Sequence, residues 1–87
     1  MFESDVERYL VDRCKARGGE VRKVRWIGRH GAPDRRVMLN GVCFWVELKA
    51  PGERCKPHQI REHARMRKHG ERVFVIDSLE GVDEVLK

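Results

Sequence analysis

The sequence predicts one α/β domain, residues 1–87, in which helices flank a mixed four-stranded sheet in the order α-β-β-β-α-β-α. Three observations support this fold class. Apolar residues recur at helical spacing in three segments, Asn40-Gly41 is a strong hairpin signal between apolar runs, and residues 73–76 form an unbroken apolar strand. A chain of 87 residues has a small core, so partner chains and self-association are to be considered.

The first segment predicts a helix that is capped by Ser4 and ends at Gly18-Gly19. Glu7 follows Ser4 at the third position, as in a capping box, and two successive glycines end a helical pattern. The apolar residues at helical spacing are Phe2, Val6, Tyr9, Leu10 and Cys14.

Residues 20–26 predict a strand and residues 27–33 a loop, which lead into a hairpin over residues 35–49. Asn40-Gly41 can supply the positive φ angles of a two-residue type I′ turn, which sets the register of the hairpin. Continuing that pairing outward from the turn places Asp34 opposite Glu47. Because side chains alternate along a strand, the charged residues at this end are predicted to share one face.

Pro57 predicts the first turn of a helix that runs to His69 and stops at Gly70. The predicted inward arc of this helix comprises Ile60, His63 and Ala64. Gln59 and Met66 lie at one edge of that arc. Residues 73–76 predict a fully buried strand that lies parallel to the preceding one through a right-handed crossover. Ser78 is predicted to cap a last helix, with the inward residues Leu79, Val82, Val85 and Leu86.

Charge and composition fit a nucleic-acid partner, although charge alone also fits an ordinary solvated surface. Nineteen Lys and Arg against fourteen Asp and Glu leave a net charge of +5, and a basic body of this kind fits a polyanion. The three cysteines show no CxxC spacing and no signal peptide is recognisable, so we expect a reducing, cytoplasmic location. The apolar runs are too short to cross a bilayer.

The histidines and tryptophans offer weaker candidate sites. His58, His63 and His69 point in different directions on one predicted helix, so we expect surface histidines and no zinc site. Trp26 and Trp45 could stack on bases, but their predicted strand positions favour core packing. The sequence contains no phosphate-binding glycine motif and no Ser-His-Asp arrangement.

The three converging charges Asp34, Glu47 and Lys49 need a counter-ion. Carboxylates directly opposite on neighbouring strands lie ~5 Å apart, and an effective dielectric of ~20 gives a repulsion of ~3 kcal/mol. The total stability of such a domain is only roughly 4 to 13 kcal/mol. A protonated carboxyl or Lys49 could relieve the repulsion in part, but Mg²⁺ resolves it more completely, with the Leu48 backbone carbonyl as a further ligand. The alternative is an ordinary cross-strand ion cluster, which the position at the rim of the sheet disfavours.

A family resemblance rests on these residues. Pro33-Asp34 followed by Glu47-Leu48-Lys49 resembles the PD-(D/E)xK nuclease signature. With the segments "ESDVERYLVDRCKARGG", "FWVELKAPGERCKPHQ" and "VFVIDSLEGVDEVL", it resembles, over nearly the whole chain, the stand-alone virus-type VRR-NUC domain. The resemblance implies a restriction-endonuclease-like fold and a phage or prophage origin.

The resemblance also implies the roles of individual residues. Asp34 and Glu47 would bind Mg²⁺, with Mn²⁺ able to substitute, and Lys49 would position or polarise the attacking water. Gln59 would support the site from its helix, and Glu7 would complete it.

Two of these roles compete with simpler interpretations. Glu7 could be only the capping-box partner of Ser4, although it lies on the flank of a buried arc, where a carboxylate needs a reason. Glu3 shares that flank one turn earlier and is the substitute candidate. Gln59 could be an amide at the edge of the core that is satisfied by the backbone.

Together, the residues and the resemblance predict a metal-dependent endonuclease that hydrolyses DNA phosphodiester bonds. The resemblance suggests branched DNA, in particular four-way (Holliday) junctions, cleaved by a homodimer, although a flap nuclease would have much the same site. The alternative from another class is a non-catalytic nucleic-acid-binding module. The predicted phosphate contacts are Arg22, Lys23, Arg25, Arg29, Arg35, Arg36, Arg61, Arg65 and Lys68.

Overall fold

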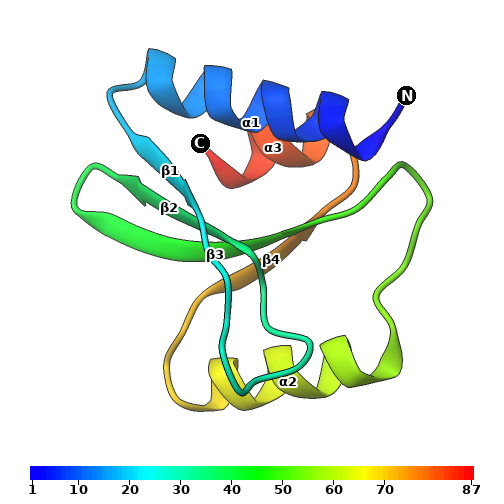
Figure 1. Ribbon diagram of the computed structural model, residues 1–87. Helices are drawn as coiled ribbons and strands as arrows, with labels where there is room; N and C mark the ends of the chain where they lie inside the picture. The colour runs from blue at the N-terminus through cyan, green and yellow to red at the C-terminus, as the bar shows by residue number, and fades with distance from the viewer.

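The computed structural model describes all of residues 1–87 and confirms the predicted fold class and order of elements. The elements are α1 (Glu3–Ala16), β1 (Glu20–Lys23), β2 (Arg35–Leu39), β3 (Val42–Leu48), α2 (Pro57–Lys68), β4 (Val73–Ile76) and α3 (Leu79–Val85). The strand order is β1-β2-β3-β4, with β2 antiparallel to both its neighbours and β4 parallel to β3. Figure 1 shows α1 and α3 on one side of the sheet and α2 on the other. None of the helices is both long enough and apolar enough to span a membrane.

The β2–β3 hairpin has the predicted turn and register. Asn40 and Gly41 adopt φ angles of 52° and 76°, which are the positive values that a type I′ turn requires. Leu39 pairs with Val42, and the ladder continues to Arg35 opposite Val46. The turn therefore sets which residues meet at the far end of the hairpin, where the candidate site lies.

The hydrophobic core fills the space between the sheet and the pair α1 and α3. It is a single cluster of ten buried residues from α1, the sheet and the α3 segment, and α2 contributes none. Its members are Val6, Leu10, Cys14, Val37, Phe44, Val46, Leu48, Ile76, Val82 and Leu86. Because alternate residues of β3 face this core, the residues between them face α2.

The helix α1 begins without the predicted Ser4 cap. Phe2 is the N-cap residue, and its backbone N–H donates a 2.6 Å hydrogen bond to the Asp5 carboxylate. Ser4 lies inside the first turn, and Asp5 takes the reciprocal role predicted for Glu7, because an acid at the third helical position can reach back to that N–H. The capping-box interpretation of Glu7 is therefore wrong.

The helix α2 turns a different face to the sheet than predicted. His63 is buried, as its place on the predicted inward arc requires, but Ile60 is 57% exposed, Ala64 is exposed, and Glu62 is buried instead. The prediction followed the apolar residues of the helix, but the sheet surface beneath α2 carries charged side chains. The helix therefore buries polar side chains that can pair with that surface.

Both edge strands also differ from their predictions. The strand β1 ends at Lys23 because, after a last hydrogen bond from the Val24 N–H to the Asp34 carbonyl (2.8 Å), the chain leaves the sheet. In β4, Phe74 and Val75 are 37% and 43% exposed, so the predicted full burial is wrong. An edge strand has only one neighbour, and α2 leaves part of this face open.

The last helix has the predicted cap. The Ser78 hydroxyl accepts a 2.9 Å hydrogen bond from the Gly81 N–H. Val82 and Leu86 are buried against α1, while Leu79 and Val85 are half-buried. This helix completes the core without reaching the candidate site.

Candidate active site

Three charged side chains gather at one end of the β2–β3 pair. Glu47 is the penultimate residue of β3 and Lys49 follows the strand, and they are only 8% and 7% exposed. Asp34 directly precedes β2, so with Arg35 opposite Val46 the next pair along the ladder is Asp34 and Glu47. The arrangement is the one that the hairpin register predicts.

The β1–β2 loop holds Asp34 close to α2. Gly31 has a φ angle of 84°, and a Cβ atom at this position would lie 2.7 Å from the His58 carbonyl oxygen. Only glycine allows this approach without a shift of backbone. Pro33 is buried, so the loop enters β2 in contact with the start of α2.

Burial makes it difficult for both acids to be ionised. It raises the pKa of Glu47 to about 7, and the charge of Asp34 adds to the increase while Lys49 offsets part of it. Burial likewise raises the pKa of Asp34. The two carboxylates therefore repel each other, and Lys49 does not cancel that repulsion.

The two carboxylates fit a hard divalent cation. The Asp34 Oδ1 atom is buried and has no hydrogen-bond partner, which is unfavourable for a carboxylate unless a cation lies beside it. No three His, Cys, Asp or Glu side chains converge in metal-binding geometry. Asp34 and Glu47 could hold Mg²⁺ with water and a main-chain oxygen, as this ion commonly allows. The Leu48 side chain is in the core, so only its carbonyl could contribute, and this role remains a prediction.

Gln59 connects Lys49 to the start of α2. Its Oε1 accepts a 3.0 Å hydrogen bond from the Lys49 ammonium and a 2.8 Å hydrogen bond from the Lys56 backbone N–H. The amide is therefore satisfied by the backbone and also holds the lysine of the site. Both interpretations of Gln59 describe part of its geometry.

Arg35 connects the acids of α1 to the site. Its guanidinium forms ion pairs with Glu7 and, at 2.9 Å, with Asp34, and its side chain is 7% exposed. The prediction that Arg35 contacts DNA phosphate is wrong, because these carboxylates already occupy the buried guanidinium. The charge of Glu3 raises the pKa of both Asp34 and Glu47. Glu7 and Glu3 thus both act on the site, and the choice of catalytic acid between them remains a prediction.

Comparison with known proteins shows the family of the chain. No protein-family model matches it. It is 47% identical over 77 residues to "Putative nuclease p44" of Acyrthosiphon pisum secondary endosymbiont phage 1. This alignment covers 87% of this chain and 83% of the phage protein. A solved structure described as "VRR_NUC domain" has a TM-score of 0.86 and 45% sequence identity, and the match covers 97% of this chain and 92% of that one. The chain belongs to the VRR-NUC family.

Membership of this family makes the chain a nuclease. The alignments extend over most of both relatives, so the whole α-β-β-β-α-β-α unit corresponds to the VRR-NUC domain. The similarity to the phage protein agrees with the virus-type resemblance.

In this VRR-NUC domain, Gln59→Ala is expected to lower nuclease activity about tenfold and to destabilise the fold by ~1 kcal/mol. The substitution removes the acceptor that positions Lys49 and leaves the Lys56 N–H without its partner. Gln59→Glu is the matched control, because a carboxylate retains an acceptor for both donors. Single-turnover rates and thermal unfolding measure the two effects. Unchanged activity in Gln59→Ala would mean that Lys49 is positioned by other contacts.

His63 is a site residue that sequence reasoning missed. It is 1% exposed, which agrees with its predicted place on the inward arc of the helix, whereas the expectation of a surface histidine is wrong. Its Nε2 lies 3.7 Å from the Glu47 Oε1 and has no hydrogen-bond partner. Burial, with the charge of Arg67, lowers the pKa of His63, so the ring is neutral at pH 7. The available signal was its spacing of four residues after Gln59, which puts both on one helix face.

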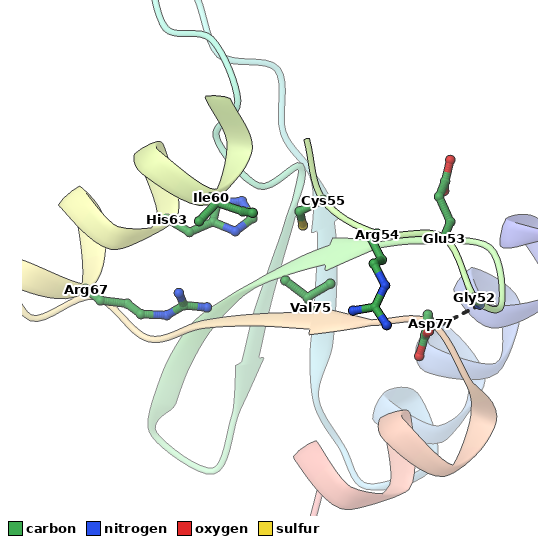
Figure 2. Close-up of a pocket in the computed structure, with 9 residues that line it drawn as sticks. All are labelled: Gly52, Glu53, Arg54, Cys55, Ile60, His63, Arg67, Val75 and Asp77. Atoms are coloured by element: carbon green, nitrogen blue, oxygen red, sulfur yellow. Dashed lines mark hydrogen bonds between the residues drawn. The ribbon is translucent and has the colours of Figure 1, made fainter. Parts of the chain in front are cut away.

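A cavity of about 480 Å³ opens beside His63 on the β4 side of the VRR-NUC site. Figure 2 shows Arg54 and Arg67 on either side of Val75 in this cavity, with Cys55 above the strand. The arginines could contact phosphate at its rim.

The other predicted phosphate contacts of the VRR-NUC domain lie around α2 and the β1–β2 loop. Arg29 and Arg65 have half-exposed side chains that both pair with Glu62. Arg36 lies 4.7 Å above the Trp45 ring and is less exposed. The exposed remainder comprises Arg22, Lys23, Arg25, Arg61 and Lys68. Their contacts with DNA remain predictions.

Proposed function

We propose that this domain is a Mg²⁺-dependent endonuclease that hydrolyses phosphodiester bonds in branched DNA. The observation that carries the proposal is the pairing of Asp34 and Glu47 beside Lys49 at the end of the β2–β3 hairpin. The buried carboxylate of Glu47 and the half-buried carboxylate of Asp34 repel each other, which favours a divalent cation between them. A bound Mg²⁺ would lower the pKa of a coordinated water and offset charge that develops on the phosphate.

The residues of the chain supply orientation and fixed charge. Asp34 and Glu47 would hold the cation, with Mn²⁺ able to replace Mg²⁺ because both accept oxygen ligands. Lys49, fixed by Gln59, provides a positive charge beside the scissile phosphate and orients the attacking water. His63 limits the movement of the Glu47 carboxylate from the α2 side.

Branched DNA and a homodimer form the second part of the proposal. A four-way junction has two-fold symmetry, and a two-fold symmetric enzyme can deliver one cut from each subunit. The VRR-NUC family supports this choice of substrate class by resemblance. Sizing by light scattering tests the dimer, and a monomer at concentrations that give paired cuts would contradict it.

The cleavage test uses labelled four-way junction, flap and linear duplex with Mg²⁺, Mn²⁺ or EDTA. Wild-type protein is expected to nick the branched substrates with either metal and none of them in EDTA. Lys49→Ala is expected to lower nicking at least about 100-fold while DNA binding is retained, because the fixed charge acts on the reacting phosphate.

The matched control is Lys87→Ala, which removes a lysine that is 75% exposed at the far end of the domain. This variant is expected to cleave like wild type. Binding without nicking in any metal would instead support a non-catalytic nucleic-acid-binding module, and equal nicking of linear duplex would remove the branched-DNA part of the proposal.

A further inference from the structure

We propose that a groove between the β1–β2 loop and α2 binds an unpaired DNA nucleotide beside the cutting site, a proposal that rests on the proposed function. The groove encloses about 520 Å³, within the range of small-ligand pockets. Its apolar lining comes from Trp26 and Met66, and its cations are Arg29, Arg65 and Lys68. Apolar and cationic groups therefore face the same space.

Trp26 forms a fixed aromatic surface in this groove. Its Nε1–H donates a 2.7 Å hydrogen bond to the Pro33 carbonyl, and its ring packs against Trp45 with centroids 5.0 Å apart. The indole is nevertheless 36% exposed, so the predicted core packing of Trp26 is wrong. The difference arises because β1 ends at Lys23 and Trp26 lies above the sheet surface. A ring held on one side and open on the other is suited to stacking.

The groove contains three cations, and Glu62, the first of its two acids, can neutralise only one positive charge. Glu62 pairs with Arg65 at 2.7 Å and with Arg29 at 3.7 Å. Lys68 belongs to none of the ion pairs in the chain. The α2 side of the groove is therefore positive and suits a phosphate group.

The second acid of the groove is also occupied. Glu71 accepts a 2.7 Å hydrogen bond from the Trp45 Nε1–H and lies 3.5 Å from the Arg36 guanidinium. Arg36 lies over the Trp45 ring, and Trp45 in turn contacts Trp26 with the two ring planes inclined by 47°. These contacts hold the Trp45 ring in place. They also pair the negative charge of Glu71 with the Arg36 guanidinium, which weakens its repulsion of DNA.

The combination favours an unpaired nucleotide over a duplex. Single-stranded DNA is bound by grooves that join cations for the backbone with aromatic rings for the bases. In a duplex the bases are stacked inside, so phosphates would meet the cations while the exposed face of Trp26 stayed unused.

The groove adjoins the site of cleavage. Pro33, which holds the Trp26 indole, immediately precedes Asp34. Trp45 lies two residues before Glu47 on the same face of β3, a separation of ~7 Å. A nucleotide on Trp26 would thus lie next to the bond that is cut. Among the branched substrates of the proposed function, the groove favours those that carry an unpaired nucleotide at the branch, as a flap does, over fully paired branches.

Binding without metal tests the groove. We would compare a blunt duplex with the same duplex carrying a short single-stranded flap, in EDTA, by fluorescence anisotropy. Trp26→Ala is expected to weaken flap binding at least about fivefold and to change blunt-duplex binding less than about twofold, because one base loses its stacking partner. Trp26→Phe is expected to bind like wild type. Val11→Ala is the matched control, since Val11 is 38% exposed on α1, across the sheet from the groove, and its loss should change neither.

A second measurement does not alter Trp26. Trp45→Phe leaves Trp26 as the sole tryptophan of the chain, and its fluorescence is expected to be quenched by the flap substrate but not by the blunt duplex. Equal losses on both substrates in Trp26→Ala, or equal quenching by both, would overturn the proposal. Because no metal is used, a wild-type protein that fails to cleave contradicts the proposed function and not the groove. Cleavage of branched DNA with unchanged flap binding in Trp26→Ala contradicts the groove alone.

Discussion

Glu47→Gln is expected to abolish nuclease activity and, at the same time, to stabilise the metal-free domain. The substitution keeps the size of the side chain but removes the charge that would hold the cation, so activity should fall at least about 100-fold. Stability should rise because Glu47 is buried beside Asp34, and the Glu47 carboxylate is harder to ionise in the fold than in the unfolded chain.

The direction of the pH dependence follows from the pKa. Burial, with the charge of Asp34, raises the pKa of Glu47 from 4.5 to about 7, so between these values the folded state binds more protons than the unfolded state. Stability therefore falls as the pH rises through this range and reaches its low level above pH 7. The shift corresponds to up to ~3 kcal/mol. Glu47→Gln should remove this dependence, so its gain in melting temperature appears at pH 8 and disappears at pH 4.

Thermal unfolding in EDTA at several pH values measures the effect, and ~3 kcal/mol corresponds to more than ~10 °C for a domain of this length. Glu84→Gln is the matched control, because Glu84 is 73% exposed on α3 and pairs only with Lys87. Mg²⁺ should stabilise wild type at pH 8 but have little effect on Glu47→Gln. A large fall in the melting temperature of Glu47→Gln at pH 8 would show that the carboxylate belongs to a structural network.

Arg35→Met is expected to destabilise the metal-free domain by ~2–4 kcal/mol at pH 8. Arg35 is 5% exposed and pairs with both Glu7 and Asp34. Without it, Lys49 is the only buried cation that remains near Glu7, Asp34 and Glu47. The expected loss is moderated because Glu7 and Asp34 are themselves partly exposed. Mg²⁺ should restore more stability to Arg35→Met than to wild type, since a cation replaces part of the missing charge.

Melting temperatures with and without Mg²⁺ test this expectation, and Arg36→Met provides the comparison. Arg36 is the next residue of β2, faces α2 and is 28% exposed, so its loss should cost less than ~1 kcal/mol. Lowering the pH to 4 should reduce the defect of Arg35→Met, because protonated carboxyls no longer need the guanidinium. An equal defect at both pH values would indicate lost packing and not lost charge.

The pairing of the two acids was predictable from local chemistry. Asn40-Gly41 admits the positive φ angles of one turn type, and that turn sets the partner of every residue in the hairpin as far as Asp34 and Glu47. The cap at Ser78 and the parallel placement of β4 follow from equally short-range signals and from the handedness of crossovers.

Other features depended on contacts between distant segments. The rotation of α2, which buries Glu62 and exposes Ile60, reflects the charged sheet surface beneath the helix and not the apolar pattern of the helix itself. Whether Trp26 is buried depends on where β1 leaves the sheet. The pairing of Arg35 with Glu7 depends on α1 lying across the end of β2, a distance of 28 residues along the chain. Turn chemistry and strand alternation act between near neighbours and can be read from the chain, whereas the orientation of a helix and the partner of a buried charge arise only when the layers pack together.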